Sequence, residues 1–149
     1  MAFTLRVEGF RHGEPIPKVH TCESSDLSPE LNWSGEPAHT QSFALIVDDP
    51  DAPMGTWNHW LVWDIPAETH RIAEGSSAGV SGTSDFGRTG YGGPCPPKGH
   101  GPHRYFFKLY AVDVPKLGIE ASAQRADLDK ALRTHVAAEA SYMGRYERR

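Results

Sequence analysis

The longest apolar pattern in the chain predicts two strands joined by a loop. Phe43 to Val47 is an unbroken apolar run rich in β-branched and aromatic residues, and its short length fits a buried strand better than a helix. The second run, Asn58 to Ile65, would place His59, Leu61, Trp63 and Ile65 on one side and Trp60, Val62 and Asp64 on the other. Because the connection between the runs is short, we expect an antiparallel pair.

This pairing would bring charged side chains to one end of the predicted sheet. Asp49 leaves the first strand at the end where His59 enters the second, and Pro50 and Pro53 restrict the loop between them. A carboxylate and an imidazole would therefore face each other at the mouth of the sheet.

Other segments predict further strands and core positions. Residues 3–7 alternate between apolar and polar side chains, as a half-buried antiparallel strand does. Residues 18–22 predict another short strand, and Leu31 and Trp33 are expected in the core. Residues 103–112 carry large side chains on both faces, which predicts a strand with little contact with water.

Only one segment has helical periodicity. Apolar residues recur at helical spacing from Asp127 onward, at Leu128, Leu132, Val136 and Ala140. We expect a helix there, capped by Asp127 or Ser122, and a short final strand near residues 143–146.

The turn-rich segments complete the predicted fold. Residues 66–84 and 87–102 are rich in Gly and Pro and poor in large apolar residues, so we expect them on the surface. Several strands, one clear helix and no βαβ alternation predict a single domain over residues 1–149. Its fold class is mostly β, an antiparallel β-sandwich with one or two short helices.

Composition and charge exclude several classes of function. The 149 residues include 15 Lys and Arg against 19 Asp and Glu, so nothing indicates binding to nucleic acid or to an acidic membrane. No apolar run approaches the ~20 residues of a transmembrane segment, and the N-terminus shows no secretory pattern, so we expect a cytoplasmic protein. Cys22 and Cys95 are too few for a disulfide framework, and we expect no bridge between them.

The end of the sheet is the candidate site. If residues 103–112 lie near the central pair, His103 and Tyr105 converge with Asp49 and His59. Imidazole and phenol donors suit a small anion such as phosphate or a carboxylate, and proline and tryptophan faces would keep water out. Because charged histidines would hold the anion, we expect affinity to rise as pH falls through roughly 6.5.

Each of these residues also has a structural explanation when it is taken alone. Residues 49–53 resemble an ordinary turn, and a histidine beside three tryptophans is commonly a core residue. Trp57 is by the same reasoning a packing residue, although its position would let it line a pocket rim.

Two long motifs resemble the signature regions of the phosphatidylethanolamine-binding protein family, also called the Raf kinase inhibitor protein family. They are DDPDAP followed by WNHWLV, and GYGGPCPPKGHGPHRYFFKLYA. The shorter pieces GEPIPKVHT and SPELNW also resemble it, in the form of the bacterial and archaeal branch. The resemblance implies a β-sandwich with an anion pocket formed by Asp49, Trp57, His59, Pro96, Pro97, His103 and Tyr105.

The function expected from these residues and from the resemblance is binding rather than catalysis. We expect a regulatory protein without a cofactor that holds a phosphate- or carboxylate-bearing ligand and inhibits a kinase or a protease. The resemblance also implies a homodimer. The chain lacks the C-terminal extension of eukaryotic members after Arg149, so their route of kinase regulation is not implied.

Two alternatives remain open. A hydrolase could use Asp49, His59 and His103, but the chain has no G-x-S-x-G elbow and no P-loop, and a Cys–His pair would need Cys95 to meet His103. A metal site is the other alternative, although the H-x-x-H spacing lies in a predicted loop rather than on a helix. Its ligands would be Asp49, Asp51, His59, His100 and His103.

Overall fold

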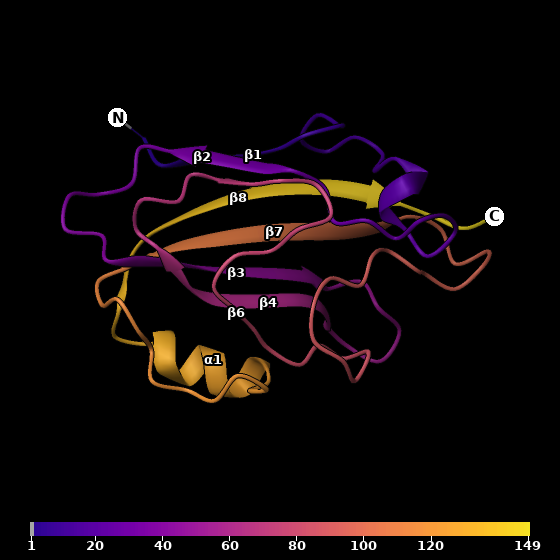
Figure 1. The fold of residues 1–149 in the computed structure, drawn as a ribbon. Helices are drawn as coiled ribbons and strands as arrows, with labels where there is room; N and C mark the ends of the chain where they lie inside the picture. The colour runs from indigo at the N-terminus through magenta and orange to yellow at the C-terminus, as the bar shows by residue number, and fades with distance from the viewer. Residues whose placement is uncertain (1) are drawn as a thin grey trace.

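The computed structural model describes residues 2–149 and consists of two antiparallel sheets that pack against each other, with one helix on the outer side of the larger sheet (Figure 1). The predicted β-sandwich is confirmed. The smaller sheet has the order β1 (Thr4–Val7), β2 (Leu31–Ser34) and β5 (Arg71–Ile72). The larger sheet has the order β6 (Val80–Ser81), β4 (Trp57–Pro66), β3 (Ser42–Asp49), β7 (His103–Val112) and β8 (Val136–Tyr146).

The central strand β3 is buried along its whole length because both of its faces are covered. Phe43, Leu45 and Val47 pack in the core between the two sheets. Ala44 and Ile46 face the opposite side and pack with the helix α1 (Arg125–Leu132). A strand covered on both faces is expected to be apolar throughout, which explains the unbroken run in the sequence.

Two irregularities in the pairing of β3 with β4 change which way the β4 side chains point. Val47 pairs with Trp60 and Asp48 with Asn58, so His59 is the extra residue of a β-bulge. A second irregularity near Asp64, whose φ is 54°, places Ile65 in the core between the sheets. The prediction that His59 and Ile65 share a face with Leu61 is therefore wrong.

The C-terminal region contains a shorter helix and a longer strand than the sequence predicts. The helix α1 begins at Arg125 and ends at Leu132, with Gln124 as its N-cap rather than Asp127 or Ser122. The Asp127 carboxylate accepts a hydrogen bond from the Gln124 N–H. Val136 and Ala140, which the apolar spacing assigned to the helix, lie in β8, because β8 pairs with β7 along almost its full length. Leu128 and Leu132 do pack in the core as expected.

Residues 18–22 form no strand. Lys18–His20 is a single 3₁₀ turn, in which the His20 N–H donates to the Pro17 carbonyl and the Thr21 N–H to the Lys18 carbonyl. The Tyr91 hydroxyl donates a hydrogen bond to the His20 carbonyl at 2.7 Å. This contact joins the turn to the segment that leads from Tyr91 to Cys95.

The expectation that Cys22 and Cys95 are unbridged is also wrong. The two residues form a disulfide, with a Cα–Cα distance of 5.4 Å and a sequence separation of 73. The Cys22 N–H donates to the Pro94 carbonyl, so backbone contacts bring the two cysteines together. Their spacing in the sequence carries no sign of this proximity.

No helix within residues 2–149 is long and apolar enough to cross a membrane.

Candidate functional site

A cavity of about 260 Å³ lies at the end of the larger sheet, where β3 ends and β4 and β7 begin. All seven residues that the sequence analysis selected lie on its wall: Asp49, Trp57, His59, Pro96, Pro97, His103 and Tyr105. Ala52, Pro53, Phe86 and Cys95 complete the wall. The strand pairing therefore brings together side chains that are up to 56 positions apart, from Asp49 to Tyr105.

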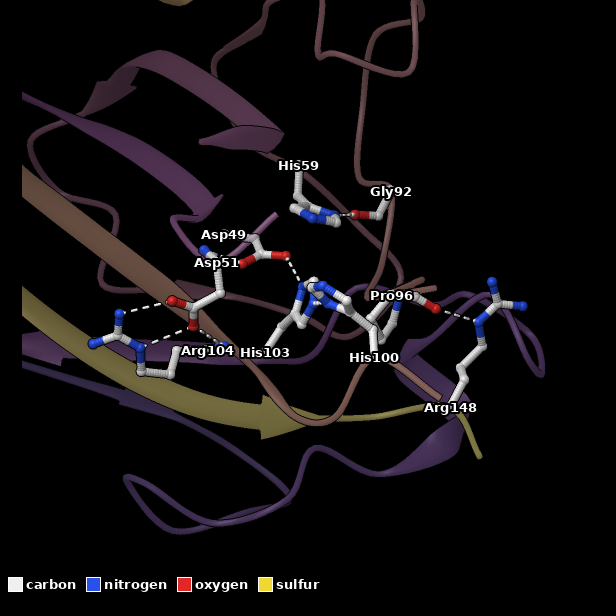
Figure 2. Close-up of polar contacts among 9 residues, drawn as sticks. All are labelled: Asp49, Asp51, His59, Gly92, Pro96, His100, His103, Arg104 and Arg148. Carbon is white, nitrogen blue, oxygen red and sulfur yellow. Dashed lines mark hydrogen bonds and ion pairs between the residues drawn. The ribbon is translucent and has the colours of Figure 1, made fainter. Parts of the chain in front are cut away.

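Asp49 holds His103 in one orientation (Figure 2). The His103 Nδ1–H donates to Asp49 Oδ2 at 2.6 Å, and the two side chains are only 2% and 4% exposed. The other carboxylate oxygen of Asp49 accepts the Asp51 N–H at 2.7 Å. Because both oxygens of Asp49 have partners, neither the carboxylate nor the ring can turn without losing a buried hydrogen bond.

The second ring nitrogen of His103, Nε2, is hydrogen-bonded to His100. The distance from His100 Nδ1 to His103 Nε2 is 2.6 Å, so an N–H of one ring donates a hydrogen bond to the nitrogen of the other. His100 is exposed, whereas His103 is buried. The contact therefore links the buried pair of Asp49 and His103 to the surface.

The surroundings of His59 favour the neutral imidazole rather than the charged imidazolium expected of an anion receptor. Its Nδ1–H donates to the Gly92 carbonyl at 2.7 Å, since a carbonyl can only accept. Burial lowers the pKa of His59, which favours the neutral ring. With the proton on Nδ1, the neutral ring carries a lone pair on Nε2.

Tyr105 contributes a hydroxyl that has no hydrogen-bond partner among residues 2–149. The residue is only 1% exposed, and its ring contacts the ring of His59 with centroids 5.2 Å apart. Burial and the nearby Asp49 carboxylate raise the pKa of Tyr105, so the hydroxyl keeps its proton. An unsatisfied buried hydroxyl costs roughly 1–3 kcal/mol, and a ligand that accepts its hydrogen bond would recover that cost.

Two arginines hold the loops at the entrance of the cavity in place through hydrogen bonds. Arg104 donates to the Asp51 carboxylate through its backbone N–H, Nε and Nη2, at 2.9, 2.9 and 2.8 Å. The Arg104 guanidinium lowers the pKa of Asp51 to about 2. On the opposite side, Arg148 Nε donates to the Pro96 carbonyl at 2.6 Å, and Figure 2 shows Arg148 beyond Pro96.

The mouth is also aromatic. Trp57 and Phe86 are each 36% exposed and meet edge to face with ring centroids 5.6 Å apart. Phe86 also contacts the ring of His59 at 5.3 Å. A Cβ added to Gly92 would lie 2.4 Å from the Phe86 ring, so a small residue is needed where the Gly92 carbonyl holds His59.

The sequence analysis missed three residues that shape the site: Phe86, Gly92 and Arg148. Phe86 is the large apolar residue of an otherwise polar, Gly-rich loop, and that contrast was the available signal. Gly92 lies within the second motif but acts through its backbone carbonyl, and Arg148 acts through its side-chain contact with the Pro96 carbonyl, so the sequence does not indicate either role.

The five residues of the alternative metal site are not arranged as a set of metal ligands. Asp51 is paired with Arg104, and the rings of His100 and His103 are hydrogen-bonded to each other. Among residues 2–149, no group of three or more His, Cys, Asp or Glu side chains is arranged to hold a metal ion.

Comparisons with known proteins identify the family of this chain. The family model described as phosphatidylethanolamine-binding protein matches residues 7–147. A UPF0098 protein of Aquifex aeolicus is 48% identical over 145 residues, which cover 93% of this chain and 85% of that protein. A UPF0098 protein of Pyrococcus horikoshii is 44% identical, with 94% of this chain and 74% of that protein covered.

Two solved structures share the whole fold. A putative phosphatidylethanolamine-binding protein homologue from Chlamydia trachomatis superposes with a TM-score of 0.93 at 38% identity, and each chain is 99% covered. E. coli YbcL, described as a new member of the mammalian family, gives a TM-score of 0.92 at 34% identity, again with 99% of each chain covered. With the family model spanning residues 7–147, these relatives show that the chain belongs to the phosphatidylethanolamine-binding protein family.

Proposed function

We propose that this protein binds a small anionic group, a phosphate or a carboxylate, in the cavity at the end of β3, β4 and β7. The observation that carries the proposal is the buried hydroxyl of Tyr105, which has no partner and lies on the same wall as His59 and His103. Natural structures rarely bury a polar group without a partner, so each such group calls for an explanation. A ligand that accepts hydrogen bonds supplies one.

The two histidines would complete the receptor. A proton taken up at His59 Nε2 would turn its lone pair into a charged donor, and charge-assisted hydrogen bonds are roughly twice as strong as neutral ones. His103 Nε2 becomes accessible when the exposed His100 ring moves away. Asp49 would balance a positive charge on His103 through the 2.6 Å hydrogen bond.

We further propose a regulatory protein rather than an enzyme. The paired Asp49 and His103 resemble an acid–base pair, but no serine or threonine lies among the described residues of the cavity wall. Cys95 lies there as half of a disulfide and cannot act as a nucleophile in that state. Turnover of p-nitrophenyl phosphate that disappears in His103→Ala would contradict this part of the proposal and favour the hydrolase.

The proposed partners follow from the family. Its name describes binding of phosphatidylethanolamine, whose head group contains a phosphate. Inhibition of a kinase or a protease and a homodimeric state remain predictions for this chain, to be checked by inhibition assays and by sedimentation. The cytoplasmic location is a prediction too, and the disulfide favours an oxidising compartment instead.

Tyr105→Phe separates binding from folding. Because the hydroxyl has no partner, removing it is expected to leave the free energy of unfolding unchanged or slightly higher. The same change should weaken the binding of sulfate or phosphate about fivefold, the value of one lost hydrogen bond of about 1 kcal/mol. Calorimetric titration of both proteins at one pH, with urea denaturation alongside, measures the two effects.

The matched control is Tyr110→Phe, since Tyr110 lies on the same strand but outside the cavity. That variant should bind as the wild type does. Equal affinity of Tyr105→Phe and wild type, or no detectable anion binding by the folded wild type, would contradict the proposal.

The pH dependence of binding should report on His59. Because burial lowers the pKa of His59 in the free protein, the proton needed at Nε2 must be taken up with the anion. Affinity should therefore fall up to tenfold for each unit of rising pH, in a window that extends below the ordinary value of about 6.5. Sulfate is the suitable probe because its charge does not change near neutral pH. Calorimetry in buffers of different ionisation enthalpy counts the protons.

His59→Gln provides the control, since its amide cannot take up a proton. We expect this variant to bind sulfate more weakly and with a flatter pH profile. An unchanged slope in the variant would assign the proton to another group of the cavity. Without an anion, the lowered pKa has the opposite effect: the contribution of His59 to stability is complete above about 6.5 and is lost as pH falls toward its folded-state pKa.

A further inference from the structure

The disulfide is part of the cavity wall. Cys95 lines the cavity between the buried Pro94 and Pro96, and its partner Cys22 is exposed to solvent. The bridge thus joins a residue of the cavity wall to an exposed residue, so we expect a reductant to approach it from the Cys22 side.

The segment before Cys95 is also held by contacts that do not depend on the disulfide. The Cys22 N–H donates to the Pro94 carbonyl at 3.1 Å, and the Gly93 N–H donates to Asp26 Oδ1 at 2.9 Å. The hydroxyl of Tyr91 donates to the His20 carbonyl at 2.7 Å. These hydrogen bonds would keep the two segments together after reduction.

The wall after Cys95 has fewer attachments. Pro96 is held by Arg148 Nε, and the Gly99 N–H donates to the Arg148 carbonyl at 2.9 Å. Residues 97–100 are exposed, and Gly99 and Gly101 have φ values of 75° and 86°. This part of the wall carries Pro97 and leads directly to the contact between His100 and His103.

We propose that the Cys22–Cys95 disulfide is a redox latch, which holds Pro96 and Pro97 in the arrangement that binds the anion and releases them when a dithiol reduces it. This inference rests on the proposed anion binding. The reduced protein stays folded, because the hydrogen bonds between the two segments remain. Its cavity wall loses its covalent attachment, and its affinity for the anion falls.

The reduction is a two-electron exchange with a dithiol such as dithiothreitol. One thiolate of the dithiol attacks the sulfur of the exposed residue Cys22, the sulfur–sulfur bond breaks, and Cys95 leaves as a thiolate. The second thiolate attacks the mixed disulfide and releases Cys22, so the dithiol becomes a disulfide and both cysteines take up protons. Any thiolate that persists at Cys95 adds a negative charge to the cavity wall and opposes the anion further.

Sulfate titration of the oxidised and the reduced wild-type protein tests the latch. We expect at least tenfold weaker binding after treatment with dithiothreitol, with unchanged far-ultraviolet circular dichroism. Cys22→Ser/Cys95→Ser should bind as weakly as the reduced protein and should not respond to dithiothreitol. Cys95 is part of the wall, so Cys22→Ser, which leaves Cys95 in place, should behave like the reduced protein as well.

A second measurement does not require a ligand. Amide hydrogen exchange should become faster in residues 96–103 on reduction and remain unchanged in β3. Equal affinity in both states, or complete unfolding on reduction, would overturn the latch. If the oxidised protein binds no anion, the proposed function fails. The exchange rates of residues 96–103 still test the latch, because they show whether reduction loosens the cavity wall.

Discussion

Replacing Cys22 and Cys95 together with serine is expected to lower the free energy of unfolding by about 4 kcal/mol, because the cross-link restricts the unfolded chain. The bridge spans a sequence separation of 73, and the entropy removed from the unfolded state increases with the length of the closed loop. Urea denaturation of the oxidised wild type and of the double variant measures the difference.

Two comparisons isolate the disulfide from the serines. Wild type reduced with dithiothreitol should have the same urea denaturation midpoint as the double variant. Ser24→Ala should have the same midpoint as the oxidised wild type. A loss of unfolding free energy below about 1 kcal/mol would show that the disulfide adds little to the hydrogen bonds between residues 20–26 and 91–94. These contacts would then hold the two segments together without the bridge, or would persist in the unfolded chain and restrict it. A domain of ordinary stability, about 5–15 kcal/mol, remains folded after the larger loss.

Asp49→Ala should abolish sulfate binding and lower the free energy of unfolding by about 3 kcal/mol. The change leaves the buried His103 Nδ1–H and the partly buried Asp51 N–H without acceptors. It also frees the His103 ring to turn, so its second nitrogen no longer has a fixed direction. Urea denaturation and sulfate titration of the same preparation measure both losses.

Asp49→Asn is the matched variant. Its amide oxygen can accept the hydrogen bond from His103, but its NH2 group cannot accept the one from the Asp51 N–H, so we expect it to recover part of the stability that Asp49→Ala loses. If the asparagine variant is as unstable as the alanine variant, the charge of Asp49 or the hydrogen bond from Asp51 matters more than the hydrogen bond from His103. Normal sulfate binding by Asp49→Ala would contradict the role of this carboxylate in the site.

The sequence predicted the strands that have a clear apolar pattern. The rest of the fold depends on which strands pair with each other, and the sequence did not show this. The run from Phe43 to Val47 indicated β3 because both faces of this strand are covered. Val136 and Ala140 fit a helix equally well by spacing, and they lie in a strand because β7 offers a partner along its whole length. Spacing within one segment contains no information about such a distant partner.

The cavity residues could be predicted because strand ends place them. An antiparallel pair brings Asp49 and His59 to one edge whatever the details of the loop, and the motif after Pro102 adds His103 and Tyr105. Their chemical states could not be predicted. The neutral ring of His59 depends on burial and on the carbonyl of Gly92, a residue 33 positions away.

The bulge at His59 makes the site depend on the number of residues in β4 as well as on their identity. The side chains of a regular strand alternate between two faces, so one residue fewer between Asn58 and Trp60 would restore the regular alternation. The core side chains from Trp60 onward would keep their places, but no imidazole would then reach Tyr105 from this strand. Among relatives, a one-residue gap at this point in an alignment is therefore expected to mark a cavity without this imidazole, even where Asp49, His103 and Tyr105 are all retained.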